Sequence, residues 1–250
     1  NSMGGIMWYA SKMDSSLYYF SAALDALAKM DTTPVNRYYR TAIVQNNMSG
    51  IYSSLGKITE GIAMMKAAIH NIRQFLKLEK SPKRADGVDF EYQAIDNLAG
   101  MYKSLGDFKQ AQELLEYSYQ EKQKQFDKDN PEIFKSLLFL GQLLREEREN
   151  DKALQYLNES LAIMNRNDGD NLYWKADACY SIALAHDQIG NIEEADRYFQ
   201  QAFAFYEETL QGEYDDIYLD FLRNAALFYA ENDQSSQGLN YAEKGYAYVV

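Results

Sequence analysis

The side chains that most often perform catalysis or bind metal ions are few in this chain. Its only histidines are His70 and His186, and its only cysteine is Cys179. The apolar periodicity places His70 on a different helix from Cys179 and His186, and the three do not reproduce the spacing of a known metal site. His186 and Cys179 also fall where segments of similar pattern carry aromatic or aliphatic packing residues. We therefore expect structural roles for all three, and we expect no catalytic residue, no metal ion and no cofactor.

Motifs that bind phosphate or calcium are not supported either. The chain contains no GxxxxGK[ST] loop and no GxGxxG segment after a strand pattern, so a nucleotide site is not indicated. The run NRNDGDN at 165–171 carries oxygen ligands of the kind that calcium prefers, but it lacks the bidentate glutamate of a calcium loop. A plain turn is the favoured interpretation of this run, and the sequence does not indicate an enzyme.

The charge balance limits the kinds of partner that the chain can bind. It has 37 acidic and 25 basic side chains, and its formal net charge is −12 at pH 7. Nucleic acid requires a basic face, so we expect no nucleic-acid partner and favour a cationic or apolar one. No apolar run approaches the roughly 20 residues that span a bilayer, so we expect no membrane insertion by this segment. A single cysteine excludes an internal disulfide framework but does not fix the compartment.

The elements that must position these residues repeat along the chain. Segments 46–69, 96–119 and 180–203 read NNMSGIYSSLGKITEGIAMMKAAI, DNLAGMYKSLGDFKQAQELLEYSY and YSIALAHDQIGNIEEADRYFQQAF. When Ala99 is taken as the anchor of a copy, a glycine follows seven residues later and a small residue twelve residues later. The same spacing, with some substitutions, identifies Ser49, Gly141, Ala183 and Ala226 as further anchors. A truncated copy contains Ser16, Phe20 and Ala23.

Each copy has the pattern of a helical hairpin. Apolar residues lie three to four apart on both sides of the glycine, which is the spacing of one face of an amphipathic helix. The glycine suits the left-handed conformation that often ends a helix, although Arg148 and Asp233 stand in its place in two copies. Such a hairpin buries its apolar faces only by stacking on its neighbours. The predicted helices are 12–30, 34–54, 58–80, 88–104, 108–126, 131–147, 151–165, 171–188, 192–210, 215–231 and 235–249.

This spacing of small and large residues resembles the tetratricopeptide repeat family over about residues 7–249. The unit here is 42 residues or longer, against about 34 in the usual repeat, and in this it is similar to the repeats of kinesin light chain and of many bacterial regulators. The resemblance implies an all-α fold, a right-handed superhelical solenoid of stacked antiparallel helix pairs. It also implies a single array over 1–250, with a partial repeat at 1–33 and repeats at about 34–85, 86–129, 130–169, 170–212 and 213–250.

Both ends of the predicted array carry apolar faces. Residues 1–10 supply only part of a first helix and leave Trp8 without an obvious partner, and the segment YAYVV lies within an apolar face. Because solenoids need polar caps to stay in solution, we interpret the chain as a fragment of a larger protein, or as one whose exposed ends self-associate.

In the family that the chain resembles, a second stripe on each first helix lines a concave groove. The matching residues here are Asn47, Asp96, Asn97, Lys103, Lys135, Gln142, Arg145, Asp177, Tyr180, Asp187, Arg223 and Asn224. Asn47, Asn97 and Asn224 occupy the same place in their copies, where an amide can donate to and accept from the backbone of a bound peptide. They resemble the groove asparagines that clamp peptides in kinesin-light-chain-type repeats, although Phe139 and Ser181 interrupt the series. The alternative is that these side chains only cover exposed helix faces.

The resemblance implies a non-enzymatic scaffold that binds a peptide or helix of a partner protein in this groove. Lys135 and Arg145 suit an acidic group, whereas Asp177, Asp187 and Asp220 make the later groove negative. We therefore expect a partner of mixed charge, with its basic portion towards the C-terminal repeats. An alternative function within the same family is a sensory or regulatory region of a bacterial transcription regulator, a sensor kinase or a protease-associated protein.

Overall fold

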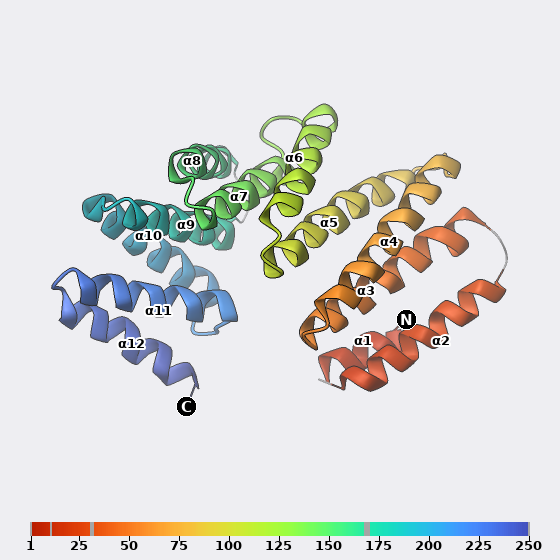
Figure 1. Cartoon of the computed structure of the whole chain (residues 1–250), viewed down its shortest axis with the longest axis horizontal. Helices are drawn as coiled ribbons and strands as arrows, with labels where there is room; N and C mark the ends of the chain where they lie inside the picture. Colours follow the sequence, from red (N-terminus) through yellow and green to blue (C-terminus); the bar gives the residue numbers. More distant parts are fainter. Residues whose placement is uncertain (1, 11, 31–32, 168–170, 250) are drawn as a thin grey trace. The chain divides into compact units, whose positions relative to one another are not determined.

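All regular structure in the described part of the chain is helical. The computed structural model describes residues 2–10, 12–30, 33–167 and 171–249. Within them lie twelve α-helices and one π-helical turn, and no strand, as Figure 1 shows. The predicted all-α fold of stacked helix pairs is therefore confirmed. The chain divides into two compact units, 1–122 and 123–250, and the single array over 1–250 stays a prediction.

The first unit is built from helices that pack on their neighbours in chain order. Its elements are α1 Ser2–Tyr9, α2 Met13–Lys29, the π-helical turn Val35–Tyr39, α3 Arg40–Ser54, α4 Ile58–Leu78, α5 Lys83–Ser104 and α6 Phe108–Gln125, whose last residues pass the boundary of the unit. Helix α1 packs with α2, α3 with α4, and α4 with α5. Fully buried Phe20, Ile51, Ile72 and Phe75 belong to the core of this unit.

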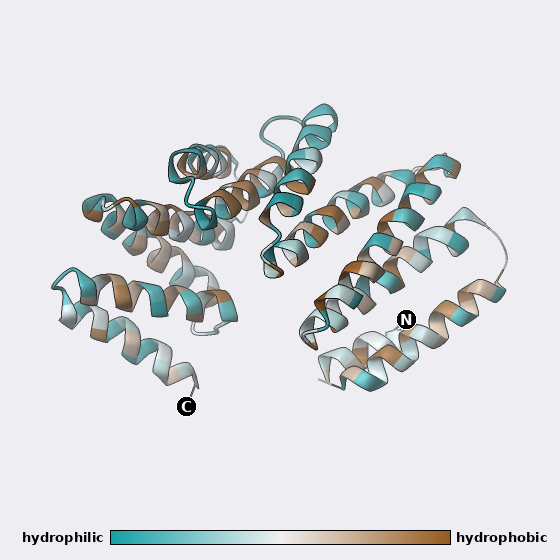
Figure 2. Ribbon diagram, in the orientation of Figure 1, coloured by the Kyte–Doolittle hydropathy of each residue, from teal (hydrophilic) through white to brown (hydrophobic). Residues whose placement is uncertain are grey.

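The second unit contains three helix pairs. They are α7 Pro131–Glu146 with α8 Asn150–Arg166, α9 Leu172–Gln188 with α10 Ile192–Leu210, and α11 Asp216–Glu231 with α12 Ser235–Val249. Helix α7 is apolar along much of its length, as the brown colour in Figure 2 shows, and it buries nine residues. Between the second and third pairs the core is aromatic, with the rings of Phe199 and Phe228 4.8 Å apart.

The anchor residue of a copy lies against the second helix of its own pair. A Cβ atom added to Gly141 would lie 2.5 Å from Leu157 Cγ, on the residue sixteen positions later. A Cβ on Gly4 would lie 2.8 Å from the ring of Phe20, which is also sixteen positions later. The same close crossing therefore forms at α7–α8 and at α1–α2, and it requires a small anchor residue.

The small residue twelve positions after the anchor meets the backbone of the first helix. A Cβ on Gly238 would lie 2.8 Å from the carbonyl oxygen of Ala226, its anchor. At the same spacing, Ser16 Oγ donates a hydrogen bond of 2.6 Å to the carbonyl oxygen of Gly4. The repeat observed in the sequence is thus a repeat of close backbone contacts.

The turn between paired helices has one conformation in all five full copies. Gly56, Gly106 and Gly190 have φ values of 72°, 76° and 75°. Arg148 and Asp233, which replace the glycine in the other two copies, have φ values of 62° and 60°. The geometry of the turn is therefore kept where the glycine is lost.

The structure corrects the sequence analysis near residue 8. Residues 2–9 form a helix of eight residues that packs with α2, because Gly4 allows α1 to approach Phe20 closely. Trp8, for which the sequence suggested no partner, lies over Gly50 of α3, where an added Cβ would lie 3.3 Å from the indole.

A second correction concerns the start of α5. It begins at Lys83, five residues before the predicted position, within a stretch interpreted as a loop. Pro82 has helical angles (φ −51°, ψ −25°), and Ala85 N–H donates to its carbonyl oxygen at 3.1 Å. Proline is compatible with a helix start, so it begins this helix early rather than delaying it.

Candidate functional site

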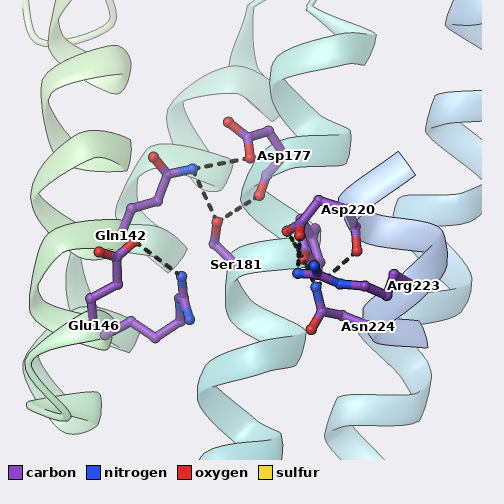
Figure 3. A network of polar contacts seen from close by, with 9 residues as sticks. Gln142, Glu146, Asp177, Ser181, Asp220, Arg223 and Asn224 are labelled. Atoms are coloured by element: carbon purple, nitrogen blue, oxygen red, sulfur yellow. Dashed lines mark hydrogen bonds and ion pairs between the residues drawn. The ribbon is translucent and has the colours of Figure 1, made fainter. Parts of the chain in front are cut away.

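Polar side chains from the three first helices of the second unit form neighbouring groups of hydrogen bonds and ion pairs, most of which Figure 3 shows. We call this surface the polar face; its residues are Gln142, Arg145 and Glu146 on α7, Asp177, Tyr180, Ser181 and Asp187 on α9, and Asp220, Arg223 and Asn224 on α11. Each helix contributes them from one stripe, since each of them lies three, four or seven residues from another.

Helices α7 and α9 are joined by an amide on the polar face. Gln142 Nε2 donates to Asp177 Oδ1 at 3.0 Å and to Ser181 Oγ at 3.1 Å. Ser181 Oγ in turn donates to the carbonyl oxygen of Asp177 at 2.8 Å. Asp177 is only 7% exposed. Its carboxylate, which was predicted to contact a partner, is largely occupied by this internal hydrogen bond.

Helices α9 and α11 are joined by a tyrosine. Tyr180 OH donates to Asp220 Oδ2 at 2.6 Å and accepts from Asn224 Nδ2 at 2.7 Å. Burial, followed by the hydrogen bond to Asp220, raises the pKa of Tyr180, so its hydroxyl remains a donor at neutral pH. Asn224 Nδ2 also donates to the backbone carbonyl oxygen of Asp220 in its own helix at 2.8 Å. The amide nitrogen is thus held by α11 while it donates to Tyr180, and so it helps to position the tyrosine.

Two arginines of the polar face differ in their exposure to solvent. Arg223 is paired with the Asp220 carboxylate, and its side chain is 69% exposed. Arg145 Nη2 lies 3.6 Å from Glu146 Oε1, and its side chain is 16% exposed. Arg145 Nε is buried and has no hydrogen-bond partner among the described residues. Buried donors are nearly always paired in proteins, so this one calls for an acceptor.

The end of the polar face near Asp187 is negative. Burial, and then the charge of Glu231 on α11, raise the pKa of Asp187. A carboxylate whose pKa is raised by a neighbouring negative charge marks a place where a cation is favoured.

An aromatic cluster that the sequence analysis did not include borders the polar face. Trp174 lies 6.2 Å from Phe139 and 6.3 Å from Tyr173 between ring centroids. Lys135 places its ammonium 5.6 Å from the Trp174 ring and pairs with Glu132 at 2.9 Å. Trp174 lies nine residues before Ala183, the anchor of its copy. The repeated spacing of small residues does not extend to that position, so it did not predict the cluster.

The predicted site residues of the first unit differ in their exposure to solvent and in their contacts. Asp96 forms an ion pair of 2.7 Å with Lys122, whose side chain is fully buried. Asn97 is exposed, whereas Asn47 and Lys103 are half-buried. Asn47 accepts a long hydrogen bond (3.5 Å) from its neighbour in the sequence, Asn46. Asp96 is thus held by a structural contact, whereas Asn97 faces solvent.

Residues with catalytic potential are not gathered in the described part of the chain. No group of three or more histidine, cysteine or acidic side chains could hold a metal ion there. Burial raises the pKa of Cys179 to about 12, so the thiol is inert at neutral pH. His186 stacks on Tyr198 with 5.9 Å between centroids, and His70 is exposed. Residues 168–170 of the proposed turn at 165–171 lie outside the described residues.

None of the described helices combines the length and the apolar character needed to cross a lipid bilayer.

Comparison with known proteins agrees with the repeat pattern. A family model described as tetratricopeptide repeat matches residues 91–166 and 132–208. No curated protein matches the chain in sequence.

Several solved structures share the fold at low sequence identity. BtubC (BKLC) from P. vanneervenii is similar with a TM-score of 0.74 and 13% identity, over 94% of this chain and 90% of that one. A putative kinesin light chain from Podospora anserina gives 0.61 and 16%, over 83% and 93%. Aspartyl phosphate phosphatase F from Bacillus subtilis gives 0.67 and 16%, over 98% and 68%. At these identities the likeness concerns the fold.

Proposed function

Because the chain belongs to the tetratricopeptide repeat family, we propose that it is a non-enzymatic interaction scaffold whose polar face binds an extended or helical segment of a partner protein. Proteins of this fold generally serve as interaction scaffolds, and the polar face is the candidate for the contact in this one.

The hydrogen bonds within the polar face support this function because they order it in advance. Gln142 ties α7 to α9, and Tyr180 ties α9 to α11. Side chains that are already fixed lose little rotamer freedom when a partner binds, which lowers the entropic cost of association. A solvated surface without such links would carry that cost in full.

Arg145 is the observation on which the proposal depends most. Its buried Nε lacks an acceptor among the described residues, whereas Gln142, Tyr180 and Arg223 have partners within the polar face. A backbone carbonyl or a carboxylate of a bound segment would contact the open part of this side chain, which is 16% exposed. Arginine on a desolvated interface is among the residues whose loss most reduces binding.

The charges of the polar face suggest the polarity of the partner. Arg145 favours an acceptor or an acidic group, whereas Asp187 and Glu231 favour a basic one. We propose a segment of mixed charge, with a lysine or arginine placed against Asp187. Complementary charges of this kind act mainly on specificity and on the association rate.

A displayed library of random peptides of about twelve residues tests the proposal, since a segment of this length suffices to occupy a recognition groove. Peptides enriched on the wild-type protein should lose affinity for Arg145→Ala by roughly tenfold or more, as expected for a central arginine. Arg197→Ala is the matched control, because Arg197 is an exposed arginine on the second helix α10 and pairs with Glu194 there. Equal loss for both variants, with folding unchanged by circular dichroism, would place the contact elsewhere.

A further inference from the structure

A pocket of about 480 Å³ lies in the first unit and shares no residue with the polar face. It lies between α2, the start of α3 and the start of α5. Its two cationic lining residues, Arg40 and Lys83, are exposed to solvent. Its apolar lining residues come from α2 and α3 and are Ala23, Ala26, Leu27, Ile43 and Val44. A volume of this size, with an apolar lining and a few charged groups, is typical of a site for a small molecule.

The repeat register explains why this space is open. Arg40 and Phe90 each lie nine residues before the anchor of their copy, and Leu27 and Ile72 each lie eleven residues after the small residue of theirs. In the next copy, Phe90 packs against the apolar cluster that contains Ile72, and Ile72 is fully buried. At the equivalent place between α2 and α3, arginine stands instead of phenylalanine, and Leu27 is only half-buried. The pocket is therefore a core position that an aromatic ring fills in the next copy.

A small residue on α2 enlarges the same space. Ala26 lies ten residues after Ser16, the small residue of its copy. The residues at this place in the five full copies are all larger, namely Asn71, Glu121, Ile163, Phe205 and Tyr248. Ala26 and Arg40 thus leave room that larger and more apolar side chains take up in the next copy.

One wall of the pocket is held in place by aromatic contacts. The ring centroid of Tyr39 lies 5.0 Å from that of Phe75 and 6.3 Å from that of Phe90. Lys83 places its ammonium 5.4 Å from the centroid of the Tyr39 ring. The wall and one of the two cations are therefore ordered before any ligand binds.

The backbone beside this wall has an unusual conformation. Tyr39 ends the π-helical turn, and the N–H of Arg40 donates to the carbonyl oxygen of Val35, five residues earlier. Turns of this type are rare, and they occur frequently at functional sites. The turn brings the tyrosine wall and the arginine together at the same pocket.

The charges that line the pocket favour an anion. Arg40 is paired with no carboxylate within the described part of the chain, and a guanidinium presents N–H donors that match a carboxylate. Two acidic residues of α5 lie near Tyr39, since its pKa is raised first by burial and then by the charges of Asp86 and Asp89. Neither of these carboxylates is among the residues that line the pocket.

We propose that this pocket binds an organic anion of low molecular weight with an aromatic body, as a second ligand of the chain. The body would take the place that the Phe90 ring occupies in the next copy, and its carboxylate would lie against Arg40 and Lys83. All of these residues belong to the first unit, so the proposal does not depend on the polar face or on its partner.

Four small probes test the proposal by methyl-selective NMR, with the methyl groups of Leu27, Ile43 and Val44 as reporters. Phenylacetate should shift these signals saturably, with a dissociation constant on the order of 1 mM for a ligand of this size. Phenethyl alcohol has the same body without the charge and should bind about tenfold more weakly. Acetate, which lacks the ring, and phenethylamine, which carries the opposite charge, should cause no saturable shift.

Two substitutions of Arg40 separate the recognition of charge from the filling of space. Arg40→Ala should weaken the binding of phenylacetate about tenfold and leave that of phenethyl alcohol unchanged, because the lost group acts on the anion. Arg40→Phe supplies the ring of the next copy and should abolish the binding of both. Arg37→Ala is the matched control, since Arg37 is exposed, lies three residues earlier and does not line the pocket. It should bind both probes as the wild type does, and circular dichroism checks that all three variants are folded.

Three results would overturn the proposal. Phenylacetate could cause no saturable shift of the reporter methyl groups, which would exclude this class of ligand from the pocket. The acid and the alcohol could bind the wild type equally well, which would show that the pocket does not recognise an anion. Phenethylamine could bind more tightly than phenylacetate, which would show that Asp86 and Asp89 govern the site.

Discussion

Arg148 and Gly106 occupy the same turn position in consecutive copies and share a left-handed backbone, with φ values of 62° and 76°. In both turns the following residue closes the helix by donating to the carbonyl oxygen five residues earlier, at 2.9 Å from Glu149 to Leu144 and from Asp107 to Tyr102. The turn is therefore set by the packing of the helix pair and not by the residue at its centre.

Arg148→Gly should stabilise the protein. A residue with a Cβ atom loses roughly 1–2 kcal/mol in the left-handed region, and glycine's greater freedom in the unfolded chain offsets part of this gain. We expect a net increase in the free energy of unfolding of about 0.5–1 kcal/mol, measured by urea denaturation. Asp233→Gly should gain less, because aspartate tolerates this conformation better. A loss of stability in Arg148→Gly would show that the arginine side chain has a structural role.

Alanine substitutions of two helical glycines should have opposite effects on stability, because only Gly141 lies at the close crossing of α7 and α8. Gly141→Ala would place a Cβ atom 2.5 Å from Leu157 Cγ and 3.2 Å from the carbonyl oxygen of Ala153, and we expect a loss of about 1–3 kcal/mol from overpacking. Gly100→Ala, at an exposed helical site with no atom within 4 Å, should gain about 0.5–1 kcal/mol. Thermal denaturation of both variants measures the difference. Equal effects would mean that the helices of the pair do not meet at Gly141.

The buried ion pair in the first unit predicts a strongly non-additive effect. Lys122 is fully buried and lies 2.7 Å from Asp96 Oδ2. Lys122→Met leaves a carboxylate without this cation in a buried site, and we expect a loss of about 3 kcal/mol or more. The double variant Lys122→Met with Asp96→Asn removes both charges and should lose clearly less. An additive pair of losses in denaturant melts would show that the two groups do not interact.

Asp187→Asn should raise the melting temperature at neutral pH. Burial, and next Glu231, raise the pKa of Asp187 above its ordinary value of 3.8, so the folded state holds this proton more tightly than the unfolded state does. The stability that the protonated group contributes is complete below the unfolded pKa and is lost as pH rises through the raised pKa. The gain from the substitution should therefore be largest near pH 7 and vanish below about pH 4. Glu159→Gln, at an exposed site on α8, should show no such trend.

The helices could be predicted from the sequence because their determinants are periodic. The small residues at the anchor and twelve positions later, such as Ala183 and Ala195, mark the crossing of each pair and so locate both helices. Predicted and observed bounds agree closely from α6 to α12. Residues 2–9 were predicted only as part of a helix, without bounds or a packing partner, because this helix has eight residues and depends on Gly4 meeting Phe20, which is a tertiary contact.

The polar face was only partly predictable from the same pattern. The stripe of first-helix residues was identified from the register, but the partner of each side chain was not. Tyr180 pairs with Asp220, 40 residues later, and Asp96 pairs with Lys122, 26 residues later. Such pairs follow no period, since they depend on how far one helix is displaced along the next. The register could therefore place Asp96 on the predicted stripe but could not show its ion pair with Lys122.

Photo-cross-linking tests the central claim most directly. A selected peptide that carries a photoreactive residue is bound to the wild-type protein, irradiated, and its attachment sites are identified by mass spectrometry. The account predicts attachment to α7, α9 and α11, at residues next to Arg145, Asp187 and Arg223. Attachment confined to the second helices α8 and α10 would contradict it.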